Sequence, residues 1–343
     1  MVVSKINFFK FFKILDYEFN QFLDLTEVNE INFSEYKDIF NASSFKEISH
    51  IQSPGYYLKK ENTIYLKLTR NNNLLAIVSL IKKRFIFNLL SIARINSGPL
   101  IIEEFSEQKY FILKAILKYV SLNYSRFISF TPSYIYSNIN LITSFNTIRL
   151  GLPPNNTYVL DLQKSEKEIY NNLKSNWRNG LKKGLRLTKV EEVNDPKKIN
   201  SILEEYKNYA KKMNFKQISY EKITTWLRNP KINKGLVNLR IYKAYKLEDK
   251  LEESKESLGS IGILFFKNKS LYLFGYTTQA GRKYQANVSM LWYSIKSSKE
   301  NGYIEFDLGG INSKTKKGIV NFKKGLNGKL KKGTGEFIYL GIF

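Results

Sequence analysis

The strongest constraint on the fold is a turn-rich junction near the middle of the 343-residue chain, RLGLPPNNTYVLDL, residues 149–162. Its glycine, paired prolines and paired asparagines interrupt regular structure and mark a domain boundary. The sequence on each side follows the same order of a β-hairpin, a strand, a helix and a closing strand. A chain of this length that is 43% hydrophobic can bury two cores. The sequence therefore predicts two similar α+β domains, with a pair of unrelated α+β domains as the alternative.

Hydrophobic periodicity assigns this order to particular segments. In the first half we predict a hairpin at residues 63–70 and 74–81, a helix at 106–124 and a strand at 126–132. In the second half we predict helices at 164–186, 196–213 and 220–228, a hairpin at 236–245 and 259–266, a strand at 270–276, a helix at 284–299 and a strand at 303–308. Ser165 and Glu168 have the spacing of a capping box. The order resembles the core of the GNAT (acyl-CoA N-acyltransferase-like) fold, present twice in tandem.

The composition excludes several kinds of chemistry. Cysteine is absent and His50 is the only histidine, so disulfides, thiolate zinc sites and cysteine nucleophiles are ruled out. The chain has neither GxGxxG nor GxxxxGK[ST]. The strand–helix junctions at residues 97–108 and 277–287 do not fit the pyrophosphate loop of acetyl-CoA enzymes of the GNAT fold. We therefore expect no cofactor and no metal, and the missing loop disfavours coenzyme A.

The charge indicates an anionic partner without choosing one. The net charge is +25, but only ten of the 55 basic residues are arginine, which is the bias that an AT-rich genome produces. RNA, a phosphate group and an anionic membrane face all remain open. Lys82, Lys83 and Arg84 interrupt the apolar stretch 74–95, which excludes a membrane span there. We expect a cytoplasmic protein whose Phe-rich start forms a core element or a peripheral contact with the inner membrane face.

A glycine-punctuated stretch near the end of the chain suggests a family. FDLGGI at residues 306–311 is followed about a dozen residues later by NFKKGLNG, and the lysine-rich segment between them reads as a cationic loop. This block resembles the Fem family (FemABX) of peptidoglycan bridge-forming aminoacyltransferases. Weaker similarity follows in the order of that family from about residue 35 onward, at residues 53–68, 95–101, 171–184 and 282–295.

The resemblance implies two GNAT-like domains, at residues 1–155 and 156–329, with a C-terminal strand at 330–343 that returns to the first. It implies an enzyme that transfers an amino acid from aminoacyl-tRNA to an amine of a muramyl-peptide precursor, either nucleotide- or lipid-linked. The ester donor is already activated, so positioning and oxyanion stabilisation supply much of the catalysis without cysteine or histidine. Two alternatives stay open: an N-acyltransferase with an acyl-CoA or carrier donor that modifies a sugar or amino acid, and a non-catalytic RNA-binding protein.

The resemblance also points to individual residues. Lys323, in the pair Phe322-Lys323, matches the lysine that the family uses beside the reacting acyl group. Lys60, or its neighbour Lys59, corresponds to a lysine on the substrate diphosphate, and Tyr284 corresponds to a tyrosine that contacts substrate at the start of a helix. The plain alternatives are a lysine in a basic loop, a solvated hairpin lysine and a packing tyrosine.

Position in the sequence adds further candidates. Asp307 follows a strand, beside Gly309 and Gly310, which would let a ligand approach; it is either a catalytic carboxylate or the cap of that turn. The cations expected to contact RNA, or else to be solvated, are Lys314, Lys316, Lys317 and Arg178. Family members with nucleotide substrates have a basic residue near residues 213–222. This chain has no arginine there, only Lys216 as a substitute, so the acceptor stays open.

Overall fold

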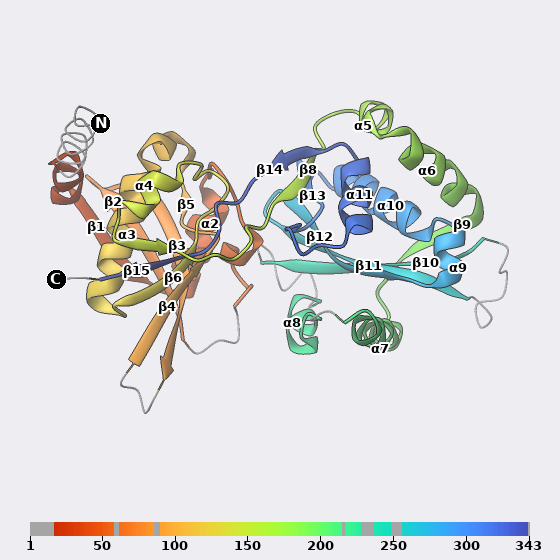
Figure 1. Cartoon of the computed structure of the whole chain (residues 1–343), viewed down its shortest axis with the longest axis horizontal. Coiled ribbons are helices and arrows are strands. Elements are labelled where there is room, and N and C mark those ends of the chain that lie inside the picture. The colour runs from red at the N-terminus through yellow and green to blue at the C-terminus, as the bar shows by residue number, and fades with distance from the viewer. Residues whose placement is uncertain are drawn as a thin grey trace. The chain divides into compact units, whose positions relative to one another are not determined.

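The structure, a computed structural model, describes residues 17–57, 62–85, 90–214, 217–227, 236–247 and 256–341. The chain divides into two units (Figure 1). The first comprises Met1–Pro154 together with Gly333–Phe343, and the second comprises Asn155–Lys332. Each unit has its own sheet and its own hydrophobic core.

The sheet of the first unit is mixed, with the order β1-β2-β3-β4-β6-β15-β7 and a short β5 beside β3. Its strands are β1 (Thr26–Ile31), β2 (Thr63–Arg70), β3 (Asn73–Phe85), β4 (Leu90–Asn96), β5 (Leu100–Ile101), β6 (Phe127–Thr131), β7 (Thr147–Arg149) and β15 (Phe337–Leu340). Asn71 and Asn72 join β2 to β3 with positive φ, as a two-residue hairpin turn requires. Strands β4 and β6 run parallel, and β15 lies between β6 and β7.

The helices of the first unit cover this sheet. They are α2 (Phe33–Ala42), α3 (Lys109–Asn123) and α4 (Ile139–Thr143), with 3₁₀ turns at His50–Gln52 and Glu103–Gln108. Helix α3 buries Ile112, Ile116 and Val120, and these side chains join a core that includes Phe130 of β6 and Phe337 of β15. The C-terminal strand therefore contributes to the first core, although it follows the whole second unit in sequence.

The second sheet has the order β14-β8-β13-β12-β11-β10-β9. Its strands are β8 (Thr157–Asp161), β9 (Thr188–Val193), β10 (Asn238–Lys246), β11 (Ser257–Phe266), β12 (Lys269–Thr277), β13 (Glu305–Asp307) and β14 (Lys329–Lys331). Strands β9 to β12 are antiparallel neighbours, and β13 then runs parallel to β12. In both units, antiparallel strands are followed in sequence by a helix and then by a strand that pairs in parallel with the sheet.

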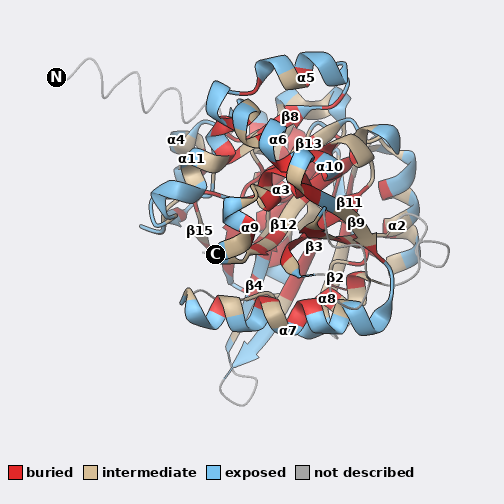
Figure 2. Ribbon diagram, turned by 90° about the vertical axis from the view of Figure 1, so that its right-hand side faces the viewer, coloured by how far each residue is buried: buried red, intermediate tan, exposed pale blue. Residues whose placement is uncertain are grey.

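Helices cover both faces of the second sheet. They are α5 (Glu166–Asn172), α6 (Ser175–Leu187), α7 (Pro196–Lys212), α8 (Tyr220–Trp226), α9 (Gln279–Lys283), α10 (Ala286–Glu300) and α11 (Lys317–Gly325). Figure 1 shows α7 and α8 on one face of this sheet, with α5, α6, α10 and α11 on the other. Figure 2 shows that the outward surfaces of α5 and α7 are exposed while the strands are largely buried. Helices α6 and α10 approach closely at Gly184, where a Cβ would lie 2.2 Å from Oγ of Ser289.

The second sheet opens between β12 and β13. The two strands pair only where Lys269, Ser270 and Leu271 face residues 305–307. Beyond Leu271, β12 continues along β11 to Thr277, whereas β13 ends at Asp307. Because parallel strands that separate leave backbone and side chains accessible between them, this opening is a natural place for a ligand in an α/β sheet.

Three predictions from the sequence require correction. The helix expected at residues 164–186 is two helices, because Leu173 takes an extended conformation and buries its side chain in the core; the capping box at Ser165 is present. The helix expected from Tyr284 starts at Ala286, and Tyr284 instead ends the short helix α9. The lysine-rich segment expected to be a loop contains helix α11, which buries Lys323 and Gly325.

Candidate active site

Lys323 is a buried cation at the opening of the second sheet. Its side chain projects from α11 and is 6% exposed. The Nζ atom donates hydrogen bonds to the carbonyl oxygens of Gly309 at 2.9 Å and Gly310 at 3.1 Å. It also lies 5.9 Å from the centroid of the Tyr272 ring, on the first residue of β12 beyond the pairing with β13. An ammonium has three N–H donors, and among the described residues two carbonyls accept from this one.

Burial changes the acid–base behaviour of this lysine. Desolvation lowers the pKa of Lys323 to about 8, and the charge of Asp307 partly opposes that shift. A lysine in such surroundings exchanges its proton within the pH range in which enzymes operate.

Asp307 holds the turn that carries those two carbonyls. Its Oδ1 accepts a 2.7 Å hydrogen bond from the backbone N–H of Gly309 and a second, short one from the hydroxyl of Thr157 on β8. Burial raises the pKa of the Asp307 carboxyl, and the bonds from Thr157 and Gly309 act against that rise. The carboxylate thus caps the turn after β13, which was one of the two roles that the sequence left open for it.

The two glycines of this turn are not equivalent. Gly309 has φ +76°, and a Cβ there would lie 2.6 Å from the carbonyl oxygen of Tyr272. A side chain at this position would therefore be strained and would also clash with backbone. Gly310 is exposed, and a Cβ there would meet nothing within 4 Å. Only Gly309 is required by the geometry of the turn.

Helix α6 fixes the position of α11. The indole Nε1 of Trp177 donates a 3.2 Å hydrogen bond to the carbonyl of Phe322, and the two rings lie 5.7 Å apart between centroids. A Cβ on Gly325 would stand 2.5 Å from Cδ1 of Trp177, so the helix backbone packs directly on the indole. Phe322, predicted to bind substrate, is partly buried in this contact. These contacts orient the face of α11 that presents Lys323.

Two polar side chains, Tyr272 at the opening and Asn287 bonded to it, escaped the sequence analysis. Tyr272 is partly buried, and desolvation raises the pKa of its hydroxyl, while a hydrogen bond with the Asn287 side chain opposes the rise. The Oδ1 of Asn287 is buried, and within the described part of the chain it has no hydrogen-bond partner. Tyr272 lies in the segment SLYLFGY that was predicted as a strand, but nothing in its pattern separates it from a core tyrosine. Thr157 and Trp177 were missed for the same reason.

Within the described chain, the remaining predicted residues are not bonded to Lys323, Asp307 or the Gly309-Gly310 turn. Lys60 falls outside the described residues. Tyr284 is partly buried against the core of the second unit, and Nζ of Lys246 lies 5.9 Å from its ring centroid. Lys314, Lys316 and Lys317 are exposed, with Lys316 and Lys317 at the start of α11.

Arg178 has a structural contact of its own. Its Nη1 donates to the carbonyl of Asn171 at 3.0 Å and, in a short bond, to that of Leu173. Both carbonyls lie at the end of α5, where the last turn of a helix leaves such groups without partners. The guanidinium therefore bridges the break between α5 and α6.

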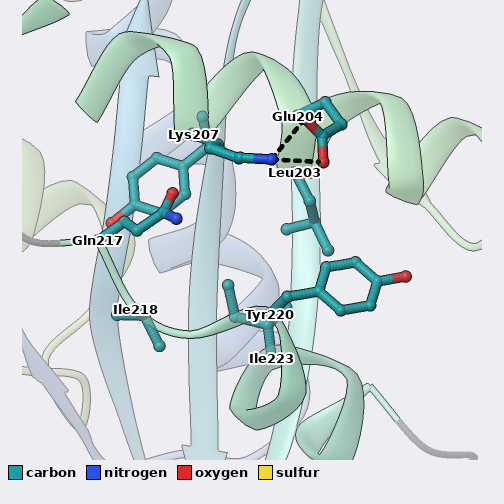
Figure 3. A pocket seen from close by; sticks show the side chains of 8 residues that line it. Leu203, Glu204, Lys207, Gln217, Ile218, Tyr220 and Ile223 are labelled. Carbon is teal, nitrogen blue, oxygen red and sulfur yellow. Dashed lines mark hydrogen bonds and ion pairs between the residues drawn. The ribbon is translucent and has the colours of Figure 1, made fainter. Parts of the chain in front are cut away.

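A separate pocket of about 310 Å³ lies between α7 and α8 (Figure 3). It is lined by Leu203, Glu204, Tyr206, Lys207, Gln217, Ile218, Tyr220 and Ile223. The one ionic contact drawn in it joins Nζ of Lys207 to Glu204 at 3.3 Å. None of the predicted site residues lines this pocket.

Among the helices in the described ranges, none combines the length and the apolar character that crossing a membrane requires.

The fold and the site define the class of this protein as a tandem GNAT-like protein. The structure is similar to that of FemX, with a TM-score of 0.71 and 15% identity over 92% of this chain and 97% of the other. It is also similar to the C-terminal domain of a putative lysylphosphatidylglycerol synthetase from Agrobacterium fabrum, with a TM-score of 0.56 and 12% identity over 91% and 93%. A tandem GNAT protein from the clavulanic acid biosynthesis pathway gives a TM-score of 0.52 and 8% identity over 93% and 99%.

The sequence comparison points to a family. Residues 191–340 match the model of the FemAB family, which agrees with the structural likeness to FemX. The matched segment contains Tyr272, Asp307 and Lys323. No sequence among the curated proteins matches this chain. The expected pair of GNAT-like domains is confirmed, and the FemAB match supports the expected family resemblance and an acyltransferase.

Proposed function

We propose that this protein is an aminoacyltransferase that moves an amino acid from aminoacyl-tRNA to an amine of a peptidoglycan-precursor stem peptide. The observation that carries the proposal is Lys323, a buried ammonium held by two backbone carbonyls at the opening of the second sheet, within the segment that matches the FemAB family. Burial of a cation costs free energy, which hydrogen bonds only partly offset. Ionisable groups with a shifted pKa in such positions are concentrated at functional sites, so the burial of Lys323 favours a functional role over a place in a solvated basic surface.

The reaction suits a site with few acid–base groups. The acceptor amine attacks the ester carbonyl of the donor, the new C–N bond forms, and the C–O bond to the ribose breaks. The proton lost by the amine ends on the departing ribose oxygen. Lys323 has one N–H beyond the two that bond carbonyls, and in this proposal it donates to the acyl oxygen as negative charge develops. Its contribution is greater in the transition state than in the ground state.

Asp307 serves as a positioning residue in this scheme. Its carboxylate bonds Thr157 and the N–H of Gly309, and so fixes the turn whose carbonyls hold Lys323. Both contacts are to Oδ1, and in this proposal the proton passes between the substrates themselves. The ring of Tyr272 lies beside Lys323 at the same opening.

The donor is a polyanion, and exposed cations precede the site in sequence. Lys314, Lys316 and Lys317 lead into α11, whose last turn and a half carries Lys323. A tRNA acceptor arm that contacts these lysines would bring its terminal ribose toward the same helix. The acceptor is a muramyl peptide whose diphosphate is linked to a nucleotide or a lipid, and Lys60 is proposed to bind that diphosphate.

A transfer assay distinguishes this function from its alternatives. Pools of tRNA charged with labelled amino acids, and separately labelled acyl-CoAs, are mixed with the protein and with a nucleotide-linked or lipid-linked muramyl peptide. We expect label from aminoacyl-tRNA on the peptide amine, abolished by Lys323→Met and retained by Lys324→Met. Label that comes from acyl-CoA alone would show that the donor is an acyl-CoA, and tRNA binding without any transfer would indicate a non-catalytic RNA-binding protein.

A further inference from the structure

The end of the β3–β4 hairpin projects beyond the strands on both sides of it. Strand β2 pairs with β3 as far as Ile81, and β6 pairs with β4 from Ile92 onward. Between these limits β3 and β4 continue to pair with each other out to Phe85 and Leu90. Figure 1 shows the two strands extending away from the sheet of the first unit. This end of the hairpin is therefore a two-stranded ribbon with exposed faces.

One face of the ribbon is apolar. Residues that are directly opposite in paired strands share a face, so Phe85 and Leu90 stand side by side, and Ile92, two residues along β4, lies on the same face. Ile92 is in turn opposite Phe127 on β6. These four side chains are exposed by 46%, 49%, 39% and 46%, respectively. We call Phe85, Leu90, Ile92 and Phe127 the apolar tip. Contiguous exposed apolar residues of this kind mark an interaction site.

Cations flank the apolar tip. Lys83 is opposite Ile92 on the same face, and Arg84 projects from the other face of β3. Both are exposed, and no ion pair with a carboxylate engages either of them among the described residues. Lys82, beside them, lies 6.0 Å from the ring centroid of Tyr124. The sequence from residue 82 to residue 96 contains no aspartate or glutamate. The end of the ribbon therefore combines apolar side chains with uncompensated positive charge.

We propose that the apolar tip, with Lys83 and Arg84, docks this protein on an anionic lipid surface. Apolar side chains enter the boundary between headgroups and acyl chains, while neighbouring cations pair with anionic headgroups. A single-stranded nucleic acid would instead use aromatic rings for stacking, whereas two of these four residues are aliphatic. A second copy of the chain would need about 800 Å² of buried surface on each partner, which four side chains at the end of a ribbon do not supply.

The test measures binding of the full chain to vesicles. Sedimentation with vesicles of phosphatidylcholine alone is compared with vesicles that contain phosphatidylglycerol. We expect binding only with the anionic lipid. Lys83→Gln with Arg84→Gln should weaken it about 10- to 30-fold, since each cation near such a surface contributes about fivefold. Phe85→Ser with Leu90→Ser should weaken it at least about 10-fold at every salt concentration, because apolar insertion is not screened.

Matched variants elsewhere on the chain control for charge and hydrophobicity. Lys211→Gln with Lys212→Gln removes two exposed cations from α7, and Leu185→Ser removes an exposed leucine from α6. Binding that falls equally with these variants, or that does not require anionic lipid, would overturn the proposal. So would a dimer in solution, or tRNA binding, that the Phe85 and Leu90 variant abolishes. Because the vesicle assay contains no donor or acceptor, its outcome is independent of the proposed transfer reaction; circular dichroism verifies that each variant is folded.

Discussion

The ammonium of Lys323 donates a 2.9 Å hydrogen bond to the carbonyl of Gly309, a residue 14 positions earlier in the chain. The contact joins the first turn after β13 to the last turn of α11, and so closes the segment between them into one unit of structure. The backbone of Gly309 in turn donates to Asp307. A cation, a left-handed glycine and a carboxylate thereby depend on one another, and the predictions below separate their contributions.

Replacing the buried lysine should remove most of the transfer activity. Lys323→Met keeps the length of the side chain but removes its donors. We expect kcat to fall by about 10²–10³, equivalent to about 2.7–4 kcal/mol, as for the loss of one donor to a developing oxyanion. Lys324→Met, on the exposed side of the same helix, should change kcat less than about twofold. Steady-state kinetics with both variants makes the comparison, and equal small losses would assign Lys323 to a general basic surface.

The rate of transfer should decline in alkaline solution. The pKa of Lys323 is lowered to about 8 by burial, so the donating ammonium is lost as the pH rises through that value. We expect kcat of the wild type to fall above about pH 8. The residual rate of Lys323→Met should lack this decline, because the titrating group is gone. A pH–rate profile of the two proteins tests this; an identical alkaline limb in both would locate the titration in another group.

The same pKa predicts how stability depends on pH. Below about pH 8 both the folded and the unfolded chain hold the proton of Lys323, whose ordinary pKa is 10.5. Between these values the unfolded state keeps the proton that the folded state has lost, so the free energy of unfolding rises with pH. Relative to Lys323→Met, the wild type should gain on the order of 2 kcal/mol between pH 7.5 and pH 10. Urea denaturation at several pH values measures this difference, and a constant difference would contradict it.

The two neighbouring glycines should respond differently to alanine. Gly309→Ala places a Cβ at positive φ and 2.6 Å from a backbone oxygen, so we expect a loss of at least about 2 kcal/mol in unfolding free energy and reduced transfer. Gly310→Ala meets open space and should stay within about 0.5 kcal/mol of the wild type. Denaturation and transfer rates of both variants are compared. Similar stabilities for the two would show that the turn relaxes without cost.

The lysines that lead into α11 should govern the salt dependence of tRNA binding. Each neutralised phosphate contributes about 0.7–0.9 to the slope of log affinity against log salt. Replacing Lys314, Lys316 and Lys317 with glutamine should therefore flatten the slope by about 2 to 3. The matched control replaces the exposed cations Lys197, Lys198 and Lys211 of α7. Filter binding at a series of salt concentrations gives both slopes; an unchanged slope for the first set would remove this segment from the RNA contact.

Much of the fold could be predicted because local patterns and tertiary packing agree. The hairpin predicted at residues 63–70 and 74–81 is found as β2 and β3, and Asn71 and Asn72 turn the chain between them. The break at Leu173 was missed because Ile169, Leu173, Trp177 and Leu181 recur every four residues, as on one face of a single helix. The asparagines and the serine around Leu173 are weak helix formers, and the Leu173 side chain packs in the core from an extended backbone.

Helix α11 and the special state of Lys323 were harder to predict. Gly318 and Gly325 lower the helix propensity of the segment, but Gly325 is present because the backbone packs on Trp177. Lys323 itself was singled out only by the resemblance of the pair Phe322-Lys323 to the Fem family, and nothing in the local pattern indicated its burial. The contacts of Thr157 and Tyr272 with this site depend on strands that are remote in sequence, so no local pattern could have indicated them.

The position of β15 has a consequence for synthesis on the ribosome. Translation delivers β6 and β7 before any residue of the second unit, and it delivers the strand that pairs with both of them only after the second unit is complete. The second unit can therefore fold while the edges of β6 and β7 that β15 will occupy are still unpaired in the nascent first unit. A premature stop after Lys332 would leave the second unit complete, but the first sheet would lack β15. A complete first sheet therefore requires that translation continue past Lys332.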